Sequence, residues 1–220
     1  MIKIAPSILS ADFSDLQSAL NLCDTGKADY IHIDVMDNHF VPNLTIGPAV
    51  VKSIRFVSKT YFDVHLMVTN PQGLLNAFAK AGANGITFHI EAVDNPGSLI
   101  DQIKSLKLDV GISLKPETPL EEITPFIDKI NRVLIMSVEP GFGEQEFIKS
   151  SLQKVQQLNN ALVQYKLINK VEIEVDGGIK LENAQDVIGA GADALVIGSG
   201  IFKAQDPVKQ LAAFKLLQKQ

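Results

Sequence analysis

The sequence has few of the residues that mark secreted or membrane proteins. Its 220 residues include one cysteine, no tryptophan and only four histidines. One cysteine can form neither an internal disulfide nor a cysteine-rich zinc site, so we expect a reducing, cytoplasmic location. No stretch approaches the ~20 uninterrupted apolar residues that span a bilayer, and the first residues, MIKIAPSILSADF, lack the apolar core of a signal peptide. We therefore expect no membrane partner.

Basic charge is also scarce. The chain has 20 Lys and Arg residues against 25 Asp and Glu residues, which gives a net charge of −5. Domains that bind nucleic acids usually carry a basic surface, so a nucleic-acid partner is not expected. Apolar side chains, in contrast, make up 46% of the residues, which is enough to drive the folding of a globular chain.

Short β-branched runs alternate with longer amphipathic stretches along the whole chain, which is typical of strands covered on both faces by helices. The expected strands are residues 2–8, 30–35, 61–66, 85–89, 109–114, 132–136, 171–175 and 194–197. The clearest expected helices are residues 12–23, 71–81, 97–106, 147–165 and 181–190. Eight units in 220 residues leave about 27 residues each, which suits an α/β fold of the (β/α)8 TIM-barrel type with parallel strands. No linker interrupts them, so residues 1–220 are expected to form a single domain; an open doubly wound sheet is the alternative.

Four residues that could bind a metal fall at the ends of expected strands. His32 and Asp34 are two apart on one strand, so both side chains face the same way. His65 and Asp176 end two other strands. In a barrel these ends meet at one mouth, where two imidazoles and two carboxylates form a mixed N/O site for a divalent metal such as Zn, Fe, Mn or Co. Each of them taken alone is more often a core residue or a helix cap.

The three internal methionines, Met36, Met67 and Met136, also lie within two residues of strand ends. Methionine usually fills gaps in a core. Met36 continues the face of His32 and Asp34, however, so the placement also suits a water-poor lining over the metal.

Glycine-rich loops follow three consecutive expected strands. They are Gly141-Phe142-Gly143, Gly177-Gly178 and Gly198-Ser199-Gly200. Tight turns need glycine in any case. The loops after the last two strands of a barrel nevertheless form its usual phosphate site, where exposed backbone N–H groups bind the anion.

Longer motifs resemble one family over almost the whole chain. They are APSILSADF (5–13), HIDVMDNHFVPNLTIGP (32–48), DVHLMV (63–68), MSVEPGFGEQEF (136–147), EVDGGI (174–179) and GSGIF (198–202). In this order they resemble the ribulose-phosphate 3-epimerase family. The resemblance implies a barrel of the ribulose-phosphate-binding type and the interconversion of D-ribulose 5-phosphate and D-xylulose 5-phosphate at C3, with proton transfer by two bases through an enediolate.

The resemblance also implies roles for particular residues. One divalent metal per subunit would be held by His32, Asp34, His65 and Asp176, and the two aspartates would be the catalytic acid–base pair. The implied substrate-binding residues are Ser7, Met36, His65, Met67, Met136, Gly141, Phe142, Gly143, Gly177, Gly178, Gly198 and Ser199. The expected partner is a small sugar phosphate, and the expected assembly is a homo-oligomer, either a dimer or a hexamer.

Three residues depart from the family pattern. Asn38 stands where glycine is usual, and asparagine tolerates a left-handed backbone better than most residues. Glu139 replaces an asparagine, and Glu144 replaces the second glycine of GFGG. A carboxylate beside a phosphate weakens binding unless it points to solvent.

Other readings remain open on these residues. An epimerase of the same family acting on D-allulose 6-phosphate would share the metal and phosphate residues. A non-catalytic phosphosugar-binding barrel predicts the loss of the acid–base pair, which is intact here. A metal-free barrel enzyme would need a catalytic lysine, for which Lys115 is the only plausible residue. His39 and His89 have no matching partner in the sequence, and we expect Glu172 or Glu174 to be enclosed in the barrel.

Overall fold

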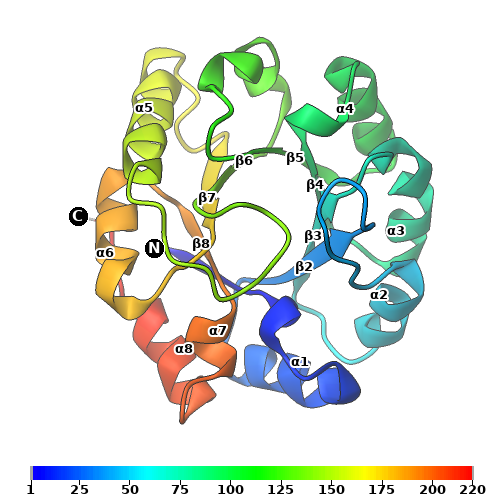
Figure 1. Ribbon diagram of the computed structural model, residues 1–220, viewed down its shortest axis with the longest axis vertical. Helices are drawn as coiled ribbons and strands as arrows, with labels where there is room; N and C mark the ends of the chain where they lie inside the picture. Colours follow the sequence, from blue (N-terminus) through cyan, green and yellow to red (C-terminus); the bar gives the residue numbers. More distant parts are fainter. Residues whose placement is uncertain (1, 220) are drawn as a thin grey trace.

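Eight parallel strands form the centre of the molecule, and helices surround them (Figure 1). The computed structural model describes residues 2–219. Its strands are β1 (Lys3–Pro6), β2 (Tyr30–Met36), β3 (Tyr61–Met67), β4 (Gly85–His89), β5 (Asp109–Leu114), β6 (Arg132–Met136), β7 (Glu172–Asp176) and β8 (Ala194–Ile197). The sheet order runs from β1 through β8, β7, β6, β5, β4 and β3 to β2. A parallel bridge between Ser7 and His32 joins the two ends, so the predicted barrel is confirmed.

The register between β2 and β3 places the polar side chains of the two strands side by side. His32 pairs with Asp63, Asp34 with His65, and Met36 with Met67. Because side chains alternate between the two faces of a strand, these three pairs lie on the same face in successive layers. The intervening residues are apolar and buried, which explains why β2 is buried on both faces.

The helices lie outside the strands and follow them in sequence. They are α1 (Leu16–Thr25), α2 (Pro48–Arg55), α3 (Leu75–Ala81), α4 (Pro96–Ser105), α5 (Ser151–Gln164), α6 (Leu181–Ala190), α7 (Ser199–Phe202) and α8 (Pro207–Lys215). The sequence analysis did not predict α2, α7 or α8, although Gly47-Pro48 and Asp206-Pro207 are typical helix starts. α7 has only four residues and α8 has a weak apolar period, whereas the eight residues of α2 do follow a helical period.

The fifth unit departs from the predicted pattern. The segment between β5 and β6 contains two 3₁₀ helices, Leu120–Glu122 and Thr124–Lys129, in place of an α-helix. Pro116, Pro119 and Pro125 fall in this segment. Since proline removes a backbone donor and clashes with the preceding turn, these residues prevent a long α-helix. The expectation of eight regular strand–helix units is therefore wrong for this unit.

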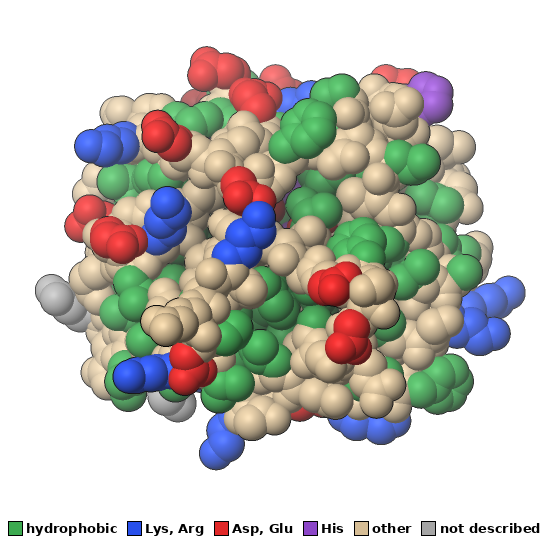
Figure 2. Space-filling view, turned by 60° about the horizontal axis from the view of Figure 1, so that its bottom comes forward, with side chains coloured by type: hydrophobic (Ala, Val, Ile, Leu, Met, Phe, Trp, Pro, Cys, Tyr) green, Lys and Arg blue, Asp and Glu red, His purple; other side chains and the backbone are tan. Residues whose placement is uncertain are grey.

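The outer surface carries charges of both signs. Figure 2 shows acidic and basic side chains interspersed with apolar ones over the visible face. Among the helices of residues 2–219, none has the length and apolar character that crossing a bilayer requires.

A buried arginine lies inside the barrel, below the layer of His32. Arg132 forms an ion pair with Asp63, and its Nε lies 3.0 Å from Glu172 Oε1 and 3.2 Å from Glu174 Oε2. Glu174 is fully buried and is thus the enclosed glutamate of β7. Burial disfavours the charged form of Arg132, but the three carboxylates raise its pKa well above its ordinary value. The arginine is therefore the counter-charge for a group of buried acids.

We predict that Arg132→Met destabilises the fold strongly. The apolar side chain leaves the fully buried Asp63 without its arginine, and an uncompensated buried charge costs about 3–5 kcal/mol, whereas Glu172 still pairs with Lys3. Urea unfolding measures the change in the free energy of unfolding. Lys52→Met, at an exposed position of α2, is the matched control and should change it by less than about 0.5 kcal/mol. Equal values for the two variants would contradict the prediction.

Candidate active site

A cavity of about 190 Å³ opens at the carboxyl ends of the strands, beneath the loop of residues 137–150 that follows β6. This loop crosses the barrel mouth in Figure 1. The predicted site residues that line the cavity are Ser7, Asp34, Met36, Met67, Met136, Gly141, Phe142, Gly143, Asp176, Gly177, Gly178, Gly198 and Ser199. The two remaining ones, His32 and His65, are fully buried beneath it. The structure thus brings all of the predicted residues to one end of the barrel.

The four predicted metal ligands form one cluster. One nitrogen or oxygen atom from each of His32, Asp34, His65 and Asp176 lies within 4.8 Å of the others. Oδ1 of Asp34 lies 3.2 Å from both His32 Nε2 and His65 Nδ1. Oδ2 of Asp176 lies 3.9 Å from His32 Nε2. Strands β2, β3 and β7 each contribute to the cluster, because their carboxyl ends meet at the same mouth.

His32 is oriented by a carboxylate on the side away from the cavity. Its Nδ1 lies 2.7 Å from Oδ2 of Asp63, which also pairs with Arg132. Within residues 2–219, the buried Nε2 of His32 has no hydrogen-bond partner, since Asp34 is close but poorly aligned. An unpartnered ring nitrogen beside two carboxylates is a donor set that fits a divalent metal. The residues therefore fit the metal that the sequence analysis expects.

His65 has a second ring behind it, from His89 at the end of β4. Nε2 of His65 lies 3.0 Å from Nε2 of His89, and Nδ1 of His89 lies 3.1 Å from Oε2 of Glu91. The sequence analysis missed this pair and found no partner for His89. The two-residue period of a strand does not reveal the contact with Glu91, because β4 ends at His89 and Glu91 lies in the 3₁₀ helix Ile90–Ala92.

The pKa values of the two aspartates in the cluster are shifted in opposite directions. Burial opposes ionisation of Asp34, but the rings of His32 and His65 outweigh it and lower its pKa far below the ordinary value. Burial and the charge of Asp34 raise the pKa of Asp176 to about 7. Two nearby carboxylates whose pKa values are pushed apart form an arrangement that suits acid–base chemistry at a single carbon.

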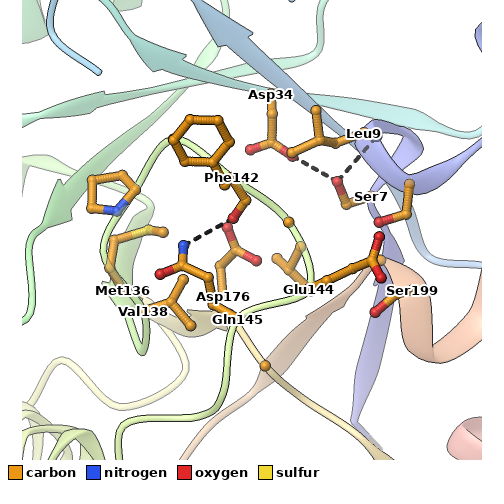
Figure 3. Close-up of a pocket in the computed structure, with 18 of the residues that line it drawn as sticks. Ser7, Leu9, Asp34, Met136, Val138, Phe142, Glu144, Gln145, Asp176 and Ser199 are labelled. Atoms are coloured by element: carbon orange, nitrogen blue, oxygen red, sulfur yellow. Dashed lines mark hydrogen bonds between the residues drawn. The ribbon is translucent and has the colours of Figure 1, made fainter. Parts of the chain in front are cut away.

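Ser7 and the methionines complete the lining of the cavity. The hydroxyl of Ser7 donates a 2.6 Å hydrogen bond to Oδ2 of Asp34, and both side chains are labelled in Figure 3. Met36, Met67 and Met136 are almost completely buried and line the cavity around the aspartates. Their thioether side chains offer water no strong hydrogen-bond partner, so this part of the cavity is apolar.

The loop after β6 is held against its neighbours. The amide of Asn43, in the loop after β2, donates to the backbone oxygen of Gly141 at 2.8 Å. Within the loop, Gln145 Nε2 donates to the Phe142 oxygen at 2.9 Å, as Figure 3 shows. Lys203 pairs with the carboxylate of Glu144 across the mouth. Two contacts thus tie this loop to neighbouring segments, and the third stabilises the loop itself.

Comparison with known proteins identifies the family. The profile of the Ribulose-phosphate 3 epimerase family matches residues 3–202. The chain belongs to this family. The cytoplasmic isoform of ribulose-phosphate 3-epimerase from Oryza sativa subsp. japonica is 45% identical over 217 residues, which cover 97% of this chain and 92% of the rice protein. Ribulose-phosphate 3-epimerase of Bacillus subtilis (strain 168) is 44% identical over 215 residues, or 98% of this chain and 99% of the bacterial protein.

Family membership gives the class of reaction. The chain is an epimerase, an enzyme of the isomerase class, and inverts C3 of its substrate. The relatives are named for ribulose phosphate, so the six-carbon alternative is not favoured.

Solved structures of other enzymes have the same fold. A structure of KGPDC from Streptococcus mutans superposes with a TM-score of 0.71 at 17% identity, covering 97% of this chain and 95% of that chain. A mutant tryptophan synthase alpha-subunit from Pyrococcus furiosus has a TM-score of 0.70 at 17% identity, with 98% of each chain covered. At such low identity the likeness concerns the barrel alone.

At position 178 of this epimerase, any residue other than glycine would require neighbouring backbone atoms to move. The φ angle of Gly178 is +63°, and a Cβ added to it would lie 2.5 Å from the backbone nitrogen of Phe147. We predict that Gly178→Ala displaces the loop after β6, lowers the free energy of unfolding by about 1–3 kcal/mol and raises KM for the sugar phosphate. Urea unfolding and steady-state kinetics measure the two effects.

Gly189→Ala is the matched control for this substitution. Gly189 lies in α6 with nothing within 4 Å of its added Cβ. Alanine should therefore stabilise the helix, by about 0.5–1 kcal/mol, and leave KM unchanged. A shift of the same sign in both variants would contradict the steric argument.

Proposed function

We propose that the chain interconverts D-ribulose 5-phosphate and D-xylulose 5-phosphate, with Asp34 and Asp176 as the catalytic acid–base pair. The observation that carries this proposal is the pair itself. Asp34 comes from β2 and Asp176 from β7, both reach the same cavity, and their pKa values are shifted in opposite directions. Figure 3 shows both side chains in the cavity wall.

The chemistry explains why two carboxylates are needed. Epimerisation at a carbon next to a carbonyl removes a proton from one face and delivers a proton to the other, through an enediolate. One carboxylate must therefore be ionised while the other is protonated, and the two exchange these states in the reverse reaction. The histidine rings beside Asp34 lower its pKa, while burial and the charge of Asp34 raise that of Asp176, and together they provide this asymmetry.

We further propose that His32, Asp34, His65 and Asp176 hold one divalent metal ion, of Zn, Fe, Mn or Co type. The unpartnered Nε2 of His32 and the N/O donor set support this assignment. When bound, a divalent metal supplies Lewis-acid stabilisation of the negative charge that develops on the substrate oxygens. The chain's own residues orient the substrate, exclude water and move the protons.

For the substrate itself, we propose that the loops after β6, β7 and β8 bind the phosphate and the sugar. Support comes from the position of Gly141, Phe142 and Gly143, of Gly177 and Gly178, and of Gly198 and Ser199 in the cavity wall. The glycines let backbone N–H groups approach an anion closely. Ser7 and His65 would contact the sugar, and the three methionines would keep water from the reacting carbon.

The organisation of the protein in the cell is also a proposal. We place residues 1–220 in one domain and the enzyme in the cytoplasm, as for the relative named a cytoplasmic isoform. A homo-oligomer, dimer or hexamer, is supported by large apolar side chains at the surface, such as Leu44 and Phe56 with 71% and 79% of their surface exposed.

We predict that Asp34→Asn and Asp176→Asn each lower epimerisation by about 10²–10⁴-fold, the usual contribution of one acid or base. Each amide keeps the size of the side chain but cannot take up a proton. Turnover of ribulose 5-phosphate is measured at saturating Co²⁺, with metal content determined in parallel, so that loss of metal is separated from loss of the base. Asp101→Asn, at an exposed position of α4, is the control.

Hydrogen exchange in D₂O sharpens this test. A variant with one remaining base should still exchange the C3 hydrogen of a single epimer, without converting it into the other. Asp34→Asn and Asp176→Asn should therefore retain exchange from opposite epimers. Turnover within tenfold of the wild type in either variant would refute the two-carboxylate scheme. Faster turnover of D-allulose 6-phosphate than of ribulose 5-phosphate would refute the substrate assignment.

A further inference from the structure

The wall of the cavity offers a phosphate few basic side chains. Among the described residues that line it, Lys180 is the one basic residue, and most of its side chain is exposed to solvent. The carboxylates of Asp34, Glu144 and Asp176 line the same cavity. A phosphate therefore depends there on neutral hydrogen-bond donors, which are backbone N–H groups and hydroxyls. Each hydroxyl of the wall that has no protein partner is thus available to the anion.

Ser10 supplies such a hydroxyl. It is half-buried, lines the cavity and is the last residue of the 3₁₀ helix Ile8–Ser10, which follows β1. Its backbone N–H donates to the oxygen of Ser7 at 3.3 Å, whereas its Oγ forms no hydrogen bond within residues 2–219. The hydroxyl of Ser7, in contrast, is already donated to Asp34. Ser10 therefore places a free donor on the cavity wall.

Two glycines define where this hydroxyl lies. A Cβ added to Gly198, after β8, would lie 2.5 Å from Oγ of Ser10, and a Cβ added to Gly143, after β6, would lie 3.7 Å from it. No Cβ approaches another heavy atom to 2.5 Å, so glycine at position 198 leaves the space that the hydroxyl occupies. The hydroxyl thus lies between two of the loops that are proposed to bind the phosphate.

One turn of chain connects this position with the acid–base pair. In a 3₁₀ turn, residues three apart lie on the same side, about 6 Å apart along the axis. Cβ of Ser7 lies 3.9 Å from the Cβ added to Gly198, so Ser7 and Ser10 both face the β8 loop. Figure 3 shows Ser7 on the same side of the cavity as Ser199 of that loop. In ribulose 5-phosphate, C4, C5 and one oxygen separate C3 from the phosphorus, a span of similar length.

We propose that the hydroxyl of Ser10 donates a hydrogen bond to the phosphate of the substrate, while Ser7, at the other end of the same turn, lies beside Asp34. The proposal rests on the phosphate site proposed above, and adds a side chain from the segment after β1 to its backbone donors. Ser10 has no part in the proton transfer. Its loss should therefore weaken binding and change the chemical step little.

Ser10→Ala removes the hydroxyl and tests this contact. We expect KM for ribulose 5-phosphate to rise about 10–100-fold with little change in kcat, the effect of losing one hydrogen bond to a charged group. Inorganic phosphate, used as a competitive inhibitor, probes the contact without the sugar, and its Ki should rise in the same range. Ser18→Ala, the same change at an exposed position of α1, should leave KM and Ki as in the wild type.

Two further measurements separate binding from packing. Because Oγ of Ser10 has no protein partner, Ser10→Ala should keep the urea midpoint of the wild type. Ser10→Asp places a carboxylate at the same point, so its Ki for inorganic phosphate should exceed that of Ser10→Ala through repulsion of like charges.

Three results would overturn the proposal: an unchanged Ki in Ser10→Ala, a lowered urea midpoint in that variant, or a Ki in Ser10→Asp no higher than in Ser10→Ala. If inorganic phosphate does not compete with ribulose 5-phosphate in the wild type, the proposed phosphate site fails instead.

Discussion

The buried carboxylate of Asp63, behind His32, is the constraint on which the candidate site depends. A neutral imidazole has one donor and one acceptor nitrogen, and its hydrogen-bond partner decides which is which. Asp63 lies 2.7 Å from Nδ1 of His32, on the side away from the cavity. Without this acceptor, the ring of His32 could turn its N–H toward the cavity. A lone pair would then be replaced by a proton in a site that needs electron donors.

Burying charged groups costs free energy, and the barrel offsets this cost by stacking its polar residues in layers. Arg132 lies lowest and pairs with Asp63 beside His32; Asp34 and His65 form the next layer, and Met36 pairs with Met67 above them. Polar character therefore decreases from the base of the barrel toward the apolar rim of the cavity. The pKa of an aspartate in this position depends on its nearest neighbours. The histidine rings lower the pKa of Asp34, whereas burial and the charge of Asp34 raise that of Asp176.

Much of this arrangement could be predicted from the sequence, because the underlying rule is local. The period of two on a strand puts His32 and Asp34 on one face, and parallel strands in a barrel bring their carboxyl ends together. This rule does not apply to Glu91, which lies in the 3₁₀ helix Ile90–Ala92 beyond the end of β4. It fails for the partnership of His65 with His89, because this depends on which strands are neighbours and on their register, neither of which a single sequence contains. The missed helix α2 is only eight residues long, although its apolar residues follow a helical period and bury Val51 and Ile54 against the barrel.

Two residues that depart from the family pattern, Asn38 and Glu144, are explained by their backbone conformation and contacts. Asn38 does adopt the left-handed backbone, with φ of +59°, so the turn after β2 survives without glycine. Glu144 also has a positive φ, +63°, at the position where the family pattern has glycine. Its carboxylate is more than half exposed and pairs with Lys203, so the two side chains together add no net charge at the mouth. The repulsion of a phosphate that the sequence suggests is therefore largely cancelled, and the same ion pair links the loop after β6 to the segment after β8.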